Sequence, residues 1–168
     1  MIKRSDKKLF YGVPGEDGAV SFVRARYFTE ASVSKNPKEY TRLYVDEATE
    51  RTDVIGYSPS ISYAFDEHKG DPVIEDIIKI TDGELLGTDA QRELVQVDFS
   101  SPVEGGGFKA VKRIFSVIAD SEGGSADAYT YSGTFKVVGK KTVGVATIKT
   151  PVDGDSETVE TIEFTEGE

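Results

Sequence analysis

The sequence predicts a mostly β fold of antiparallel strands with one short helix packed on a sheet. Two patterns predict it. Apolar and polar residues alternate with a period of two over most of the chain, which is typical of strands that bury one face and expose the other. At one place, apolar residues recur with helical spacing instead. The chain has 168 residues, a length that suits a single domain with one sizeable core.

The strand signal is clearest in three segments, each with one apolar face. These faces are formed by Ile61, Tyr63 and Phe65, by Val95, Val97 and Phe99, and by Tyr129, Tyr131, Phe135 and Val137. Residues 20–28 and 142–149 are expected to form further strands. The segment 114–119 is almost continuously apolar, which predicts a strand deep in a sheet. Residues 139–141 are predicted to turn the chain between two strands of a hairpin.

The helix is predicted to begin directly after Asp71 and to run for about three turns. Asp71 can accept hydrogen bonds from the first free N–H groups, and Pro72 suits the first helical position. Gly83 is predicted to end the helix. One helix face is apolar and carries Val73, Ile74, Ile77 and Ile78. We therefore expect this face to pack on a sheet.

Residues 34–53 are predicted to form a long, charged, irregular loop. Loops of more than ~12–15 residues in a compact domain are usually either functional or disordered. Buried aromatic side chains dominate many protein interfaces. Tyr40, Leu43 and Tyr44 are therefore candidate contacts to a neighbouring ring or subunit, and a disordered surface loop is the alternative.

The net charge of −10 is concentrated at the C-terminus, where residues 151–168 contain seven carboxylates and no Lys or Arg. Burying so many carboxylates is costly. This segment is therefore predicted to be an arm or an edge strand outside the central core. Ile162 and Phe164 share one face of it and are candidates for docking on a neighbouring subunit. The acidic balance also argues against tight nucleic-acid binding, which needs clustered Lys and Arg.

Several classes of site are disfavoured by composition. The chain has no cysteine, so disulfides, thiolate metal ligands and a cysteine nucleophile are excluded. The single histidine, His68, cannot supply the several His or Cys ligands of a transition-metal site. No apolar run approaches the ~20 residues of a membrane span, and the basic residues 1–8 are not followed by the apolar stretch of a signal peptide. We expect a soluble protein without catalytic residues, metal, cofactor or membrane partner.

Taken as a whole, the chain resembles the tail tube (major tail) proteins of long-tailed, non-contractile bacteriophages. The likeness covers nearly the full length and lies in the order of elements. These elements are a strand ending at residues 25–28, the charged loop, residues 55–57 with a Ser-rich strand, the Asp-Pro-capped helix, residues 93–99, a long apolar strand, and residues 131–135 with the turn that follows.

The resemblance implies one tail tube domain over residues 1–168, a two-sheet antiparallel β-sandwich with one flanking α-helix. It further implies hexameric rings whose inner strands join into one continuous β-barrel, and rings that stack into a tube. DNA and the tape-measure protein would pass through this tube, and tail terminator and tip proteins would cap it. Such a protein is a structural part of the virion tail, made in the bacterial cytoplasm, and not an enzyme. Some relatives carry a separate C-terminal immunoglobulin-like domain; residues 151–168 are too few for one, so we expect none within this sequence.

The lumen of such a tube is expected to pass DNA without binding it, since Lys or Arg contacts to phosphates would add salt-sensitive affinity. Candidate lumen residues on polar strand faces are Gln96, Asp98, Asp120 and Glu122. Other hypotheses remain at the level of sequence. They are a tube protein of a contractile tail or secretion-type injection system, a β-sandwich receptor- or carbohydrate-binding module that uses Tyr40 and Tyr44, and a small hydrolase with two carboxylates.

Overall fold

In the computed structural model, residues 1–149 and 160–167 are described. Residues 151–159 and 168 of the acidic segment 151–168 lie outside these residues. The elements in chain order are β1 (Lys7–Pro14), β2 (Val20–Arg24), β3 (Phe28–Ser34), β4 (Pro37–Arg42), β5 (Arg51–Tyr57), β6 (Ser60–Asp66), α1 (Pro72–Asp82), β7 (Gln91–Pro102), β8 (Phe108–Gly123), β9 (Thr130–Val137), β10 (Thr142–Lys149) and β11 (Thr161–Glu166), with short 3-10 helices at Arg4–Asp6 and Gly87–Ala90. The fold is therefore mostly β with one α-helix among the described residues, as predicted.

Six strands close into an antiparallel barrel in the order β8, β10, β11, β2, β1 and β7. The barrel closes because the first part of β8 pairs with β10 as well as with β7. A small apolar cluster is drawn from these barrel strands and consists of Phe10, Val95, Val97, Ala110, Ala146 and Ile162. Closure leaves the barrel without a free edge.

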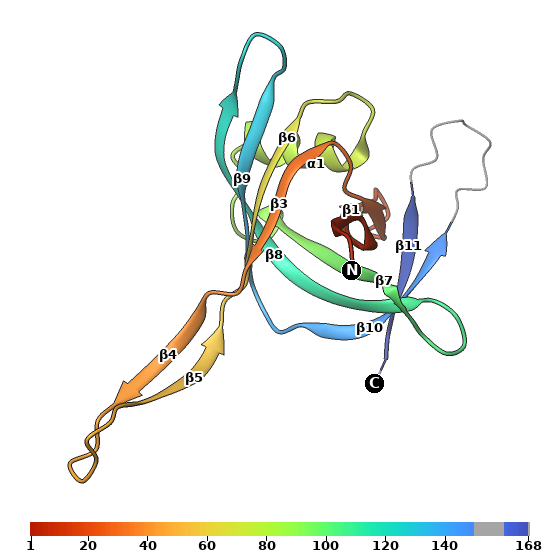
Figure 1. Cartoon of the computed structure of the whole chain (residues 1–168). Coiled ribbons are helices and arrows are strands. Elements are labelled where there is room, and N and C mark those ends of the chain that lie inside the picture. Colours follow the sequence, from red (N-terminus) through yellow and green to blue (C-terminus); the bar gives the residue numbers. More distant parts are fainter. Residues whose placement is uncertain (150–159, 168) are drawn as a thin grey trace.

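The sheet continues beyond the barrel because β8, with 16 residues, is long enough to serve two parts of it. Its second half pairs with β9, and the sheet extends through β6 to β3 (Figure 1). The larger core packs α1 and this extension against the outer wall of the barrel. The predicted two-sheet sandwich thus takes a different form, a single nine-stranded sheet curled at one end into a barrel.

The alternation predicted the buried faces of the extension correctly. Ile61, Tyr63 and Phe65 of β6 are each at most 2% exposed, and the rings of Tyr63 and Phe135 stack with centroids 4.4 Å apart. Tyr129 differs from the prediction, because it precedes β9 and remains 48% exposed.

The helix has the predicted start and end. The Asp71 side chain accepts hydrogen bonds from the N–H groups of Val73 and Ile74 at 3.1 and 3.2 Å, so it satisfies two donors that lack helical partners. The N–H of Gly83 closes the last turn on Lys79 O. The buried face carries Val73, Ile74, Asp76, Ile77 and Ile80.

Two predicted strand segments differ from the prediction, one in its length and one in its burial. The segment 20–28 is interrupted at Tyr27, where a φ of +63° turns the chain away from the direction of β2. The Tyr27 ring stacks on the His68 ring, with ring centroids 3.9 Å apart. The segment 114–119 is not deep in the sheet, since Ile114 and Ile118 are 41% and 44% exposed and alternate with buried Phe115 and Val117. The segment does alternate between buried and exposed positions, but its exposed positions also carry apolar residues, so the sequence did not show the alternation.

The predicted hairpin at residues 139–141 is also wrong. In the described part of the chain, β9 and β10 pair successively with β8 and not with each other. The N–H of Val138 donates to Ile114 O at 2.9 Å, which guides the chain along β8 from the extension into the barrel. A turn signal shows that the chain bends, but it does not show which strand comes next.

The predicted C-terminal edge strand is instead an inner barrel strand. β11 lies between β10 and β2 and pairs with both. Ile162 is only 4% exposed and belongs to the barrel cluster of its own chain. The carboxylates of β11 avoid burial because Glu163 and Glu166 are exposed, while Glu160, which precedes the strand, pairs with Arg24 at 3.1 Å and Lys8 at 3.5 Å.

Candidate assembly surfaces

The four-stranded extension has two open edges. β3 pairs only with β6, so its other edge has no partner strand among residues 1–149 and 160–167. β8 pairs with β7 only as far as Ser116, and residues 117–123 pair on one side alone, with β9. Unpaired N–H and C=O groups along such edges favour pairing with another strand. The two edges belong to the same sheet and face away from each other.

The outer face of this extension, opposite the core, is lined mainly by small hydroxyl side chains, with the exposed Ile118 beside Thr134 as an apolar exception. Cross-strand rows place Ser32 beside Ser62 and Ser62 beside Thr134. The Ser121 and Ser132 hydroxyls share a hydrogen bond of 2.6 Å. The hydroxyl residues of this face are Ser32, Ser34, Ser60, Ser62, Ser116, Ser121, Thr130, Ser132 and Thr134. We call it the hydroxyl face.

Charged residues on the hydroxyl face are few and mixed in sign. By register they include Glu30 beside Ala64, Asp66 beside Thr130, and Lys136 beside Ser60. The charged share of this face is lower than that of the whole chain, in which 30% of residues are charged. The face is thus mostly polar and close to electrically neutral.

The segment predicted as a loop is a β-hairpin that projects from the body of the molecule (Figure 1). β4 and β5 form a separate two-stranded sheet, with Tyr40 opposite Asp53. We call residues 37–57 the arm. Tyr40, Leu43 and Tyr44 are 43%, 54% and 46% exposed, so all three candidate contact residues are free on the surface of this chain. A lone two-stranded hairpin is marginally stable in water, and an exposed apolar tip favours a partner.

Comparison with known proteins gives a clear structural likeness. No family model and no curated protein matches the sequence. The SPP1 tail tube, solved by solid-state NMR and cryo EM, has a TM-score of 0.63 and 15% identity over 86% of this chain and 80% of that chain. The tail of an empty GTA particle, computed by helical refinement with C6 symmetry, has a TM-score of 0.59 and 15% identity over 84% and 98%.

The chain has the fold of a tail tube protein. At this level of identity, the likeness concerns the fold, and the roles of individual residues rest on the geometry of this chain.

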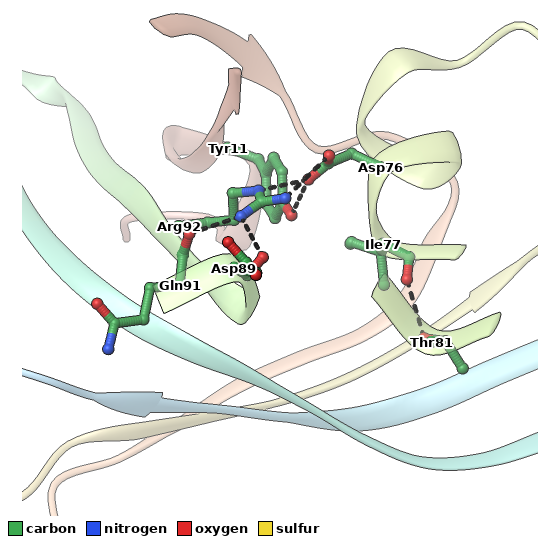
Figure 2. A network of polar contacts seen from close by, with 7 residues as sticks. All are labelled: Tyr11, Asp76, Ile77, Thr81, Asp89, Gln91 and Arg92. Atoms are coloured by element: carbon green, nitrogen blue, oxygen red, sulfur yellow. Dashed lines mark hydrogen bonds and ion pairs between the residues drawn. The ribbon is translucent and has the colours of Figure 1, made fainter. Parts of the chain in front are cut away.

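A buried polar network joins the helix of this tail tube fold to the barrel (Figure 2). Tyr11 Oη of β1 donates to Asp76 Oδ2, and Arg92 of β7 donates to the same carboxylate from Nε at 2.8 Å and from Nη2 at 3.3 Å. Burial, followed by the nearby Asp76 charge, raises the pKa of Tyr11 well above its usual value. Arg92 also donates to the carbonyls of Asp89 and Gln91.

This network is best explained as an anchor for α1. The Asp76 carboxylate is 8% exposed, and the donors of the network reach either this carboxylate or the carbonyls of Asp89 and Gln91. The sequence analysis missed it, although a signal was present. Asp76 lies on the apolar stripe of the helix, three residues after Val73 and four before Ile80. A carboxylate at such a position needs buried partners.

The four candidate lumen residues do not lie together on the hydroxyl face. Gln96 follows buried Leu94 on the outer barrel wall, on the same side of β7. Asp98 lies beside it, 3.9 Å from Lys7 Nζ, and hydrogen bonds from Ser100 lower the pKa of Asp98.

Asp120 and Glu122 lie near the far end of β8. Asp120 occupies a bulge between Ala119 and Ser121, and Glu122 pairs in register with Tyr131, a core residue. Burial and then the Asp120 charge raise the pKa of Tyr63 to about 12. The charges of both carboxylates therefore affect tyrosines on the core side of the sheet, Asp120 affecting Tyr63 and Glu122 affecting Tyr131.

The other predicted contact residues and site classes are placed as follows. Phe164 packs partly buried on the barrel cluster, with Lys112 Nζ 5.1 Å from its ring centre, whereas Ile162 is fully inside. His68 is exposed, and its Nδ1 lies 3.0 Å from Asp66 O. Within residues 1–149 and 160–167, no group of three His, Cys, Asp or Glu is placed to hold a metal ion. Over the same residues, no helix has the length and apolarity needed to cross a membrane.

Proposed function

We propose that the chain is a structural virion protein that forms the tail tube of a long-tailed bacteriophage by stacking of hexameric rings. The observation that carries the proposal is the four-stranded extension with two open edges on a tail tube fold. The same architecture belongs to the tail of a GTA particle computed with C6 symmetry. Six subunits per ring is the number that this likeness supports.

The strand directions support ring closure through these edges. β3, β6, β9 and β8 alternate in direction, because each neighbouring pair is antiparallel. With an even number of strands, the open edge of β3 on one copy meets residues 117–123 of β8 on the next copy in antiparallel orientation. Each copy repeats the contact head to tail, and such heterologous contacts close into a ring when the rotation allows. The result is one continuous β-barrel without free edges.

In this ring, the hydroxyl face lines the lumen, and the core side of the extension faces outward. Serine and threonine hydroxyls hold water at the wall, and the few charges nearly cancel. DNA would pass through such a conduit during ejection without a row of cations to hold its phosphates. The tape-measure protein would occupy the same lumen, and tail terminator and tip proteins would bind the ends of the tube. The arm would connect rings.

Assembly of the purified protein, seen by negative-stain electron microscopy, tests the proposal. Tubes or stacked rings are expected, whereas a receptor- or carbohydrate-binding module would stay monomeric. The edge itself is tested with Ser32→Pro and Val33→Pro in parallel. The N–H groups of consecutive strand residues point to opposite sides of the strand. One of the two prolines therefore removes a hydrogen bond from β3 to β6, and the other removes only an N–H donor on the open edge of β3.

The proline variant that loses only the outward donor is expected to fold normally by circular dichroism and to form no rings. Normal rings from a folded variant at both positions, or a wild-type protein that stays monomeric at high concentration, would contradict ring closure through β3.

A further inference from the structure

An apolar groove of about 1020 Å³ lies on the core side of the extension. It lies between the N-terminal residues, the outer barrel wall, and the part of β3 and β6 from which the arm departs. Its apolar lining includes Leu9, Val33, Ile61, Val111, Val143 and Val145. Val33 and Val143 remain 42% and 49% exposed, so this lining is open to solvent in the single chain.

Cations surround this groove. It is lined by Lys3, Arg4, Lys7, Lys8 and Lys109, against a single carboxylate, Asp98. Lys7 pairs with Asp98 and Lys8 with Glu160. In the part of the chain that the structure describes, Lys3, Arg4 and Lys109 form no ion pair. The groove therefore suits an apolar segment that carries carboxylates.

The tip of the arm, residues 43–50, has this composition. It begins with Leu43, Tyr44 and Val45, and Val45 is fully exposed. Asp46, Glu47 and Glu50 follow, and the eight residues contain no Lys or Arg. Glu47 already pairs with Arg51, so Asp46 and Glu50 remain for a partner.

We propose that the groove of one copy binds the arm tip of a second copy. The apolar residues of the tip would cover the valine-rich lining, while Asp46 and Glu50 would meet the cations of the groove. The groove lies near the base of the arm, and the tip of the same chain points away from it (Figure 1). A tip-to-groove contact between copies is heterologous, so it can repeat along a stack of rings. The inference rests on the proposed tube and names its inter-ring contact.

The absence of natural cysteine allows a direct test by cross-linking. Val45→Cys is mixed with a size-tagged Val143→Cys variant under mild oxidation, and the mixture is run on a non-reducing gel. The matched control partner is Val20→Cys, since Val20 is a similarly exposed valine of the barrel (42% against 49%) outside the groove. A mixed dimer at least tenfold stronger with Val143→Cys than with Val20→Cys is expected.

A charge exchange tests the electrostatic part. Lys109→Glu is expected to raise the concentration needed for assembly about tenfold, as for the loss of roughly one charged contact per subunit. Adding Asp46→Lys or Glu50→Lys in the same chain is expected to restore assembly. Glu84→Lys, an exposed change outside both groove and arm, is the control and should not restore it.

The outcomes separate this inference from the tube itself. If wild-type tubes form but the Val45–Val143 cross-link does not exceed its control, the groove does not bind the tip. If Lys109→Glu weakens assembly and neither tip substitution restores it, another acidic segment occupies the groove and the proposal is wrong. If the wild-type protein forms no tubes and the Val45→Cys and Val143→Cys variants form no cross-link above the control, the proposed function fails together with this inference.

Discussion

At the residue scale, the buried Asp76 carboxylate of α1 depends most strongly on its hydrogen-bond partners. It accepts from Tyr11 and Arg92, which are also largely buried. Removing one partner from such a network leaves the others buried without compensation, which costs more than the network contributes in net stability. The main effect of this contact is therefore to fix the position of α1 against β1 and β7, and not to add net stability.

Asp76→Ala is expected to lower the free energy of unfolding by about 3 kcal/mol, because the buried Arg92 charge and the Tyr11 hydroxyl lose their acceptor. Urea unfolding followed by circular dichroism measures the change. Lys79→Ala, on the exposed side of the same helix, is the control and should change stability by less than about 0.5 kcal/mol. Equal effects of the two variants would show that Asp76 is not the anchor of the helix.

Tyr63 gives a pH dependence with a defined sign. Burial, with a smaller contribution from Asp120, raises its pKa to about 12 from an unfolded value of 10.0. A raised pKa means that the folded state favours the neutral phenol. The stability that the neutral Tyr63 phenol contributes is fully present below pH 10 and is lost as the pH rises toward 12.

Unfolding measured from pH 9 to 12 is expected to show a steep loss of stability in the wild-type chain and a shallower loss in Tyr63→Phe. Tyr27→Phe changes an exposed phenol and is the control. A wild-type slope retained in full by Tyr63→Phe would assign the alkaline loss to other groups, of which Tyr11 and Tyr131 are the nearest in kind.

At the element scale, the arm is an insertion in a hairpin. β3 and β6 are antiparallel neighbours, with Ser34 opposite Ser60, and the arm lies between them in sequence. Ser58 N–H donates to Asn36 O at 3.4 Å, so the two chain ends at the arm base lie side by side. The body of the fold is therefore complete without the arm.

Replacing residues 37–57 by Gly-Gly is expected to leave the thermal unfolding midpoint of the monomer nearly unchanged and to abolish tubes. A two-residue turn suits the closed hairpin that remains. Microscopy and a thermal melt on the same sample check both parts. An insertion of Gly-Gly at the tip, which keeps both arm strands, serves as a control for added flexibility. Normal tubes without the arm would contradict its inter-ring role.

The sequence predicted those elements whose signal is local. Helix α1 was predictable because Asp71, Pro72 and Gly83 mark its ends and its apolar face has helical spacing. The arm was missed because both its faces are exposed, so β4 and β5 show no alternation. Barrel closure was missed because it depends on β11, whose partners β2 and β10 include a strand more than a hundred residues away in sequence. No periodicity encodes such a pairing.

The candidate site was predictable only in part, for a related reason. Tyr40, Leu43 and Tyr44 were chosen because they lie in a long charged segment and aromatic residues often dominate interfaces. They are exposed in this chain, and their contact with another copy stays a prediction. The lumen candidates were chosen from polar strand faces, but the sequence does not tell which polar face belongs to a sheet with open edges. Our proposal gives this role to the hydroxyl face instead.

At the scale of the whole molecule, charge is distributed unevenly. Much of the net charge of −10 comes from the C-terminal residues, whereas the hydroxyl face is nearly neutral and the groove is cationic. A tube multiplies every lumen contact by the number of subunits, so a single added cation on the hydroxyl face becomes a ladder of phosphate sites along the DNA. In the proposed tube, the absence of such a ladder would let DNA move.

Assembled wild-type tubes are therefore expected to retain no DNA at low salt, whereas tubes of Ser62→Lys should retain it. Retention by Ser62→Lys should fall steeply between about 50 and 200 mM salt, because each phosphate contact releases counterions. Ser21→Lys adds the same charge at an exposed position of β2 on the barrel and is the control. Co-sedimentation of tubes with labelled DNA measures retention. If Ser21→Lys holds DNA as strongly as Ser62→Lys, the hydroxyl face does not line the lumen. Tight retention by wild-type tubes would instead show that the conduit grips DNA by contacts outside this face.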